Sequence, residues 1–258
     1  WWVFIEETIL LIDSHCHLNY LDNVTDVLQR GRASGVSGFM CISVEQSRVD
    51  EVVAIAQQHA DVWASVGVHP DAAAEDFSWV SDYADKPDVV AIGETGLDYY
   101  RTEETSVKVR QQESFAYHLD LARQRELPVI VHTRKAEQDT LKLMAQFPDV
   151  CGVLHCFTES WEMAEAALDM GFYISISGIV TFKNAASVRD VAARVPEDRL
   201  LVETDAPWLA PVPYRGKTNE PAFVADTARF IAELRDVSLP DLAATTSANF
   251  TRLFPVTA

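Results

Sequence analysis

Short apolar runs rich in β-branched residues alternate along the chain with longer segments in which apolar residues recur every three or four positions. A continuous apolar run is typical of a strand buried on both faces, and the longer spacing is typical of a helix with one buried face. Eight runs are therefore predicted to be strands: 10–13, 38–44, 62–68, 89–93, 128–132, 152–157, 172–176 and 200–204. Helices are predicted around residues 24–28, 49–55, 109–125, 141–144, 163–168, 222–234 and 239–253.

Strands that alternate with helices favour parallel strands joined by helical crossovers. An open doubly wound sheet and a closed barrel both fit this pattern, and the count of eight favours the barrel. The predicted fold is thus an α/β protein, a (β/α)₈ TIM barrel in one domain over residues 9–258. Residues 1–8, apolar and then acidic, are predicted to be an N-terminal extension.

Composition and charge narrow the classes of function. The chain has 258 residues, of which 48% are hydrophobic, and no apolar stretch is long enough for a membrane span. The net charge of −18 argues against binding nucleic acid through bulk positive charge, so a phosphate-bearing substrate must be met locally. The four cysteines form no C-x-x-C pair, and no secretion signal is found, which predicts reduced thiols in a cytoplasmic protein.

Reactive side chains gather at the ends of the predicted strands. In a barrel enzyme these ends open onto one mouth, so side chains placed there converge. The residues are His15, His17, His69, His132 and His155, with Glu94 after the fourth run and Asp205 after the eighth. His59 and His118 fall on helical patterns and are predicted to be structural.

Six of these side chains are predicted to bind metal: His15, His17, Glu94, His132, His155 and Asp205. They are too many for one tetrahedral ion, but two ions bridged by Glu94 would use them all. His15, His17 and Asp205 would hold one ion, and His132 and His155 the other. Mg²⁺ or Mn²⁺ suits these ligands, while Zn²⁺ or Ni²⁺ could occupy the site in a crystal.

Within this site, Glu94 and Asp205 are the predicted catalytic residues. Asp205 would accept the proton of an attacking water, and Asp13 and Glu203 would orient ligands from behind. The predicted substrate contacts are His69, Arg134, Arg215 and Lys217. The chain contains neither a G-x-S-x-G elbow nor a Walker A motif.

Several separated motifs make the sequence similar to the TatD family of metal-dependent deoxyribonucleases, close to its bacterial YcfH-type branch. They are Asp13-Ser14-His15-Cys16-His17-Leu18, Gly93-Glu94-Thr95-Gly96-Leu97-Asp98, Val131-His132-Thr133-Arg134, Leu154-His155-Cys156-Phe157, Glu203-Thr204-Asp205 and Asn249-Phe250-Thr251-Arg252-Leu253-Phe254. The resemblance implies a barrel, a two-metal site and Mg²⁺-dependent 3′→5′ hydrolysis of nucleic-acid phosphodiesters. It also implies that residues 1–8 have no counterpart in the family.

Three functions remain open at this point. The first is a deoxyribonuclease that acts as a monomer on single-stranded DNA or 3′ ends, away from membranes. The second is a metal-dependent carbonyl hydrolase, such as an amidohydrolase or a D-aminoacyl-tRNA deacylase, on the same barrel. Many amidohydrolases bridge their metals with a modified lysine where this chain has Glu94. The third is a barrel that binds metal without catalysis, but none of the six predicted ligands is lost.

Overall fold

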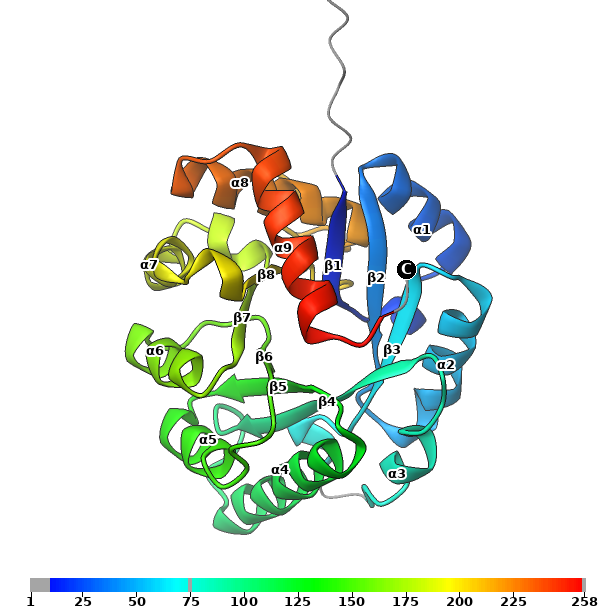
Figure 1. The fold of residues 1–258 in the computed structure, drawn as a ribbon, viewed down its shortest axis with the longest axis vertical. Coiled ribbons are helices and arrows are strands. Elements are labelled where there is room, and N and C mark those ends of the chain that lie inside the picture. Colours follow the sequence, from blue (N-terminus) through cyan, green and yellow to red (C-terminus); the bar gives the residue numbers. More distant parts are fainter. Residues whose placement is uncertain (1–9, 74–75, 257–258) are drawn as a thin grey trace, which may run out of the picture.

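Eight parallel strands form one sheet in chain order, with helices around it (Figure 1). The computed structural model describes residues 10–73 and 76–256, so the predicted extension at residues 1–8 lies outside the described residues. The strands are β1 (Leu11–Cys16), β2 (Val36–Ile42), β3 (Val62–Val66), β4 (Val89–Asp98), β5 (Val129–Arg134), β6 (Gly152–Leu154), β7 (Tyr173–Ile176) and β8 (Leu200–Val202).

The sheet curls round so that the segment after β8 reaches β1. The Asp205 N–H donates to the His15 carbonyl at 2.9 Å, and the His17 N–H donates to the Ala206 carbonyl at 2.8 Å. The Ser14 hydroxyl adds a bond to the Val202 carbonyl at 2.9 Å. The predicted eight-stranded barrel in a single domain is therefore confirmed, rather than the open sheet.

Helices cover the outside of the barrel and one of its ends. The α-helices are α1 (Val24–Ala33), α2 (Val49–Gln58), α3 (Val80–Tyr83), α4 (Thr105–Arg125), α5 (Glu137–Met144), α6 (Trp161–Asp169), α7 (Ala186–Arg194), α8 (Val224–Arg235) and α9 (Leu239–Leu253). Short 3₁₀ helices span Leu18–Tyr20, Gln46–Arg48, Pro70–Ala72, Gly178–Thr181, Glu197–Arg199 and Pro221–Phe223. Among the described helices, none has the length and apolarity needed to cross a bilayer.

Two apolar cores result from this arrangement. The larger one fills the space between the strands and the surrounding helices. The smaller one occupies the barrel interior, where Met40, Ile130 and Leu201 pack with Phe250 and Phe254. Phe250 belongs to α9, which lies across the barrel end that faces the viewer in Figure 1. This end is closed by α9, so the opposite end is left for the site.

Strand β4 departs from the prediction, because it runs on to Asp98 instead of ending at Gly93. Its pairing with β5 shifts register between Ile92 and Thr95. Gly93 and Gly96 have φ angles of +137° and +136°, which other residues rarely adopt. Glu94 thus projects from within an irregular strand, and its side chain is buried rather than exposed in a loop.

Candidate metal centre

The first group of donors surrounds one oxygen of Glu94 at the mouth of the barrel. His15 Nε2 lies 3.2 Å from His17 Nε2 and 3.4 Å from Glu94 Oε2. Asp205 Oδ1 lies 3.7 Å from His15 Nε2 and 3.4 Å from His17 Nε2. Metal–ligand bonds of about 2.1 Å space neighbouring donors roughly 3.0 Å apart in octahedral and 3.4 Å in tetrahedral geometry. These four residues therefore have the spacing of a metal-binding set.

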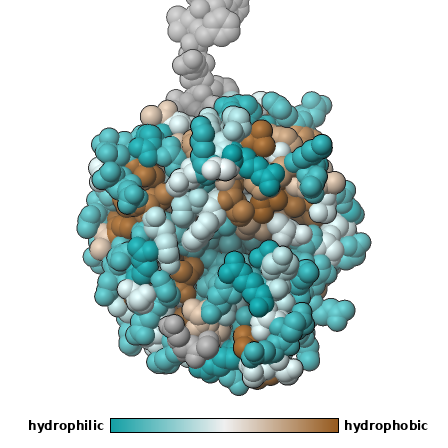
Figure 2. Space-filling model, turned by 180° about the vertical axis from the view of Figure 1, so that it is seen from behind, coloured by the Kyte–Doolittle hydropathy of each residue, from teal (hydrophilic) through white to brown (hydrophobic). Residues whose placement is uncertain are grey.

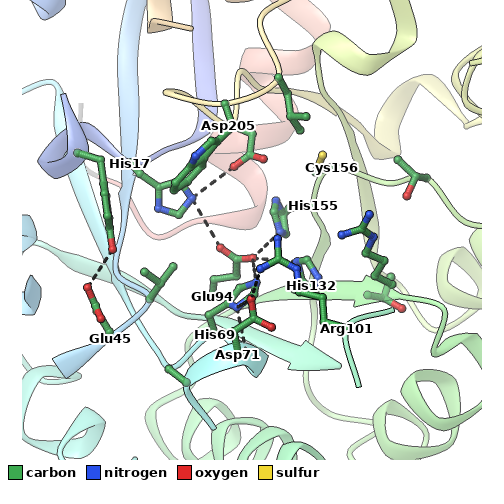
Figure 3. A pocket seen from close by; sticks show the side chains of 18 of the residues that line it. His17, Glu45, His69, Asp71, Glu94, Arg101, His132, His155, Cys156 and Asp205 are labelled. Atoms are coloured by element: carbon green, nitrogen blue, oxygen red, sulfur yellow. Dashed lines mark hydrogen bonds and ion pairs between the residues drawn. The ribbon is translucent and has the colours of Figure 1, made fainter. Parts of the chain in front are cut away.

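The second group surrounds the other oxygen of the same carboxylate. Glu94 Oε1 lies 2.9 Å from His155 Nε2, 3.0 Å from His132 Nδ1 and 3.5 Å from His69 Nε2. Figure 3 shows Glu94 between the two groups, with His17 and Asp205 on one side and the other labelled histidines on the other. The structure thus brings all six predicted ligands together, with Glu94 between them.

The outer nitrogens of three imidazoles show which of their atoms could bind metal. On the side of the ring that points away from the centre, His17 Nδ1 faces the Ile42 carbonyl at 3.3 Å, and His155 Nδ1 faces Glu203 Oε1 at 3.4 Å. His132 Nε2 faces Asp98 Oδ2 at 3.3 Å. An imidazole that donates its outer N–H to such an acceptor presents the lone pair of its inner nitrogen, as metal-bound histidines do. The donor set therefore fits divalent ions.

His69 has the opposite arrangement. Its Nδ1 accepts a hydrogen bond from the Asp71 N–H at 3.1 Å, so the proton of the neutral ring resides on Nε2, which faces the centre. Burial lowers the pKa of His69 to about 4, against the opposing effect of Glu94. His69 thus offers the centre an N–H donor instead of a lone pair, which suits its predicted contact with substrate.

Electrostatics keep the two central carboxyl groups ionised. Burial raises the pKa of Glu94, but the surrounding imidazoles, above all His155, more than offset it and hold the pKa well below its usual value. Burial likewise raises the pKa of Asp205, and His17 and His15 bring it below normal. The pKa of His155 is lowered by burial but raised more strongly by Glu94 and Glu203. A cation bound beside Glu94 would take the place of the proton on His155.

Asp13 does not have the predicted role of orienting an imidazole. Its carboxylate accepts hydrogen bonds from the Thr204 N–H at 2.8 Å and the Thr204 hydroxyl at 2.6 Å. The prediction was wrong because the alternation of side chains along β1 shows only on which side of the strand Asp13 lies. It does not show which neighbouring segment the side chain contacts there. Asp13 instead ties β1 to the segment that carries Asp205.

A cavity of about 840 Å³ opens above the donors. Figure 2 shows this face of the molecule hollowed near its centre, with hydrophobic side chains gathered beside the hollow. Arg134 lines the cavity, and its guanidinium lies 3.8 Å from the centre of the Tyr100 ring. Arg101 also lines it and donates to Asp71 Oδ2 at 2.9 Å. Two cationic side chains therefore stand beside an otherwise acidic centre.

The other two predicted substrate contacts lie elsewhere in this structure. The guanidinium of Arg215 lies over the Phe182 ring, 4.2 Å from its centre, and the Lys217 ammonium lies 6.0 Å from the centre of the Tyr214 ring. Neither residue is among those that line the cavity. Their contact with substrate stays a prediction.

Comparison with known proteins agrees with this geometry. The family model described as TatD related DNase matches residues 12–255. The chain belongs to the TatD family of metal-dependent hydrolases. It is 48% identical over 261 residues to the metal-dependent hydrolase YcfH of Escherichia coli K12, and the alignment covers 97% of each chain. A relative from Erwinia tasmaniensis, named 3′-5′ ssDNA/RNA exonuclease TatD, is 35% identical, covering 88% of this chain and 92% of its own.

The fold of the family is also seen in solved structures. The TatD homologue YjjV of Escherichia coli K12 superimposes with a TM-score of 0.88 at 29% identity, covering 96% of this chain and 98% of its own. The resemblance to the TatD family that the motifs indicated is therefore confirmed.

Three residues beside the TatD-type centre were not among the predicted site residues. Asp98 holds the outer nitrogen of His132, and the alternation of Glu94, Gly96 and Asp98 along one strand could have indicated it. Arg101 and Trp208 enter the cavity from loops. No periodic pattern marks a loop residue, so the sequence carried no signal for these two.

Proposed function

We propose that the protein is a nuclease that uses two divalent metal ions, Mg²⁺ or Mn²⁺, to hydrolyse phosphodiester bonds at the 3′ ends of single-stranded DNA. The observation that carries this proposal is the position of Glu94, whose two oxygens each face a separate group of metal donors. The name of the Erwinia relative and the description of the family model support nucleic acid as the substrate.

The proposed mechanism assigns a task to each group of residues. His15, His17 and Asp205 would hold one ion, His132 and His155 the other, and Glu94 both. Bound divalent ions supply charge for the phosphate oxygens and lower the pKa of water. The Asp205 carboxylate accepts the proton of the attacking water, while Arg134 and the His69 N–H bind phosphate oxygens.

The cellular setting is part of the same proposal. We place the protein in the cytoplasm as a monomer, in line with the four free cysteines of the described structure. Its acidity leaves local contacts at the cavity as the means of holding DNA, which suits a strand end more than a long duplex.

The deciding experiment follows end-labelled single- and double-stranded DNA, with EDTA and with Mg²⁺ or Mn²⁺ restored. Glu94→Gln should abolish cleavage and reduce the bound metal, while Glu103→Gln, a control in an exposed loop of the same mouth, should leave both unchanged. D-aminoacyl-tRNA serves as the comparison substrate. Cleavage of that ester with no metal-dependent hydrolysis of DNA would replace the nuclease proposal with the carbonyl hydrolase.

A further inference from the structure

An exposed indole stands at the edge of the cavity, next to the first group of donors. Trp208 is 47% exposed and lines the cavity with His17 and Asp205. In the part of the chain that the structure describes, the large apolar side chains left exposed include only two aromatic ones, Trp208 and Tyr100. Because this indole lies beside a cavity lined by metal donors, it offers a flat apolar face to a ligand bound there.

The indole is held firmly in place. Its ring centre lies 4.9 Å from that of His17 and 5.6 Å from that of Tyr20. The backbone N–H of Trp208 donates to the backbone carbonyl of Asp205 at 3.0 Å. The buried Asn219 side chain donates to the Trp208 carbonyl at 2.6 Å and to the Thr204 carbonyl at 2.8 Å. Binding a ligand therefore costs little ordering of this side chain.

The position of Trp208 also defines what the ligand must be. Trp208 follows Asp205 by three residues and touches His17, so the indole lies one ring away from the donor atoms. In a nucleotide, the base is separated from its phosphate by one sugar. A phosphate placed at the donors thus brings a planar base within reach of the indole.

Because the chain is strongly negative, an uncharged contact between the base and the indole is important for affinity. At a net charge of −18, long-range attraction cannot hold a polyanion, so affinity must come from the metal centre and from uncharged contacts. Stacking of a base on an aromatic ring provides an uncharged contact, and it tolerates any base because every base has a flat face.

We propose that Trp208 is the stacking platform for the base of the terminal nucleotide, whose phosphate lies at the metal centre. This inference rests on the proposed nuclease function and specifies its substrate. Stacking uses the flat face of the base and does not read its hydrogen-bonding edge, so the platform binds the terminal nucleotide without selecting its sequence.

The test compares two 5′-labelled oligonucleotides that differ only in the last unit, which is thymidine in one and an abasic tetrahydrofuran unit in the other. Trp208→Ala should lower kcat/KM on the thymidine end about tenfold and leave the abasic end nearly unchanged. Trp208→Phe should restore most of the loss, because phenylalanine keeps an aromatic face. Trp161→Ala, which removes a tryptophan on α6 outside the cavity lining, is the matched control.

An equal loss on both oligonucleotides at unchanged metal content would overturn the inference, since a residue that only supports His17 would act on both ends alike. No loss on either would overturn it as well. Binding of the same oligonucleotides, with a phosphorothioate at the last linkage and followed by anisotropy, separates this inference from the proposed function. If the wild type cleaves neither, a preference for the thymidine end that Trp208→Ala removes still supports the platform, and absence of that preference refutes it.

Discussion

At the scale of single residues, Asp205 contributes both to the group of metal donors and to the closure of the barrel. Its carboxylate lies 3.4 Å from His17 Nε2, while its backbone N–H closes the barrel onto His15. Replacement with asparagine keeps the size, the backbone bond and one donor oxygen. The side chain of Asp205→Asn therefore differs from wild type mainly in lacking a carboxylate that accepts a proton.

We expect Asp205→Asn to lower kcat on DNA by about 10²-fold or more and to change KM much less. Steady-state kinetics at matched metal content measure both constants. Asp198→Asn, an exposed acid paired with Arg199, is the control. A near-normal kcat with the full complement of metal would show that another group takes the proton.

His118 is a buried histidine with the structural role that its helical position predicted. Its Nδ1–H donates to the Ser114 carbonyl at 2.7 Å, and its Nε2 accepts from the Val68 N–H at 3.1 Å. Burial lowers the pKa of His118 to about 4. The folded protein therefore keeps this ring neutral at pH values where the unfolded chain protonates it.

The free energy of unfolding should thus be unaffected by His118 above about pH 6.5 and should fall by up to about 3 kcal/mol between there and pH 4. Urea unfolding in EDTA across this range measures the slope. His118→Gln should remove this part of the pH dependence, and His59→Gln controls for loss of an imidazole. Parallel curves for wild type and His118→Gln would contradict the assignment.

At the scale of elements, β4 is where the backbone itself shapes the centre. A Cβ built on Gly96 would collide with the His132 carbonyl, and the φ of +136° disfavours any other residue. Gly171 has a φ of +87° but nothing within 4 Å of such a Cβ. Substituting alanine at each of these two glycines therefore distinguishes the effect of an unfavourable backbone conformation from that of a steric collision.

Gly96→Ala should lower the free energy of unfolding by at least about 2 kcal/mol and weaken metal binding, since β5 carries His132. Gly171→Ala should cost about 1 kcal/mol and leave metal binding intact. Thermal unfolding and metal titration give the two quantities. Equal effects of the two substitutions would mean that β4 accommodates the added methyl group.

Predictions from sequence succeeded where burial imposes a pattern. All eight strands were found, because a strand covered on both faces must be apolar throughout. Strand β4 was cut short at Gly93, since its glycines resemble a turn in sequence. Helix α7 was missed although Val188, Val191 and Ala192 are buried at helical spacing. The convergence of the six predicted ligands could be anticipated because barrel topology alone brings strand ends together.

At the scale of the whole molecule, the centre concentrates buried polar groups that a bound cation would compensate. Wild-type protein with metal should unfold at a higher temperature than in EDTA, because a ligand at 100 times its Kd stabilises the folded state by about 2.7 kcal/mol. Glu94→Gln should lose most of this difference, whereas Glu103→Gln should keep it. Calorimetry with and without metal would contradict the assignment if Glu94→Gln retained the full shift.

The backbone hydrogen bonds between Asp205 and His15 and between His17 and Ala206 join the two ends of a long stretch of chain. His15 is translated early and Asp205 nearly two hundred positions later, so a growing polypeptide lacks the complete donor set until its eighth strand has been made. A fragment released before that point has no Asp205 and cannot assemble the centre. Because of the order of the strands, an unfinished chain cannot have the proposed DNA-cutting activity. That activity can begin only when synthesis is nearly complete.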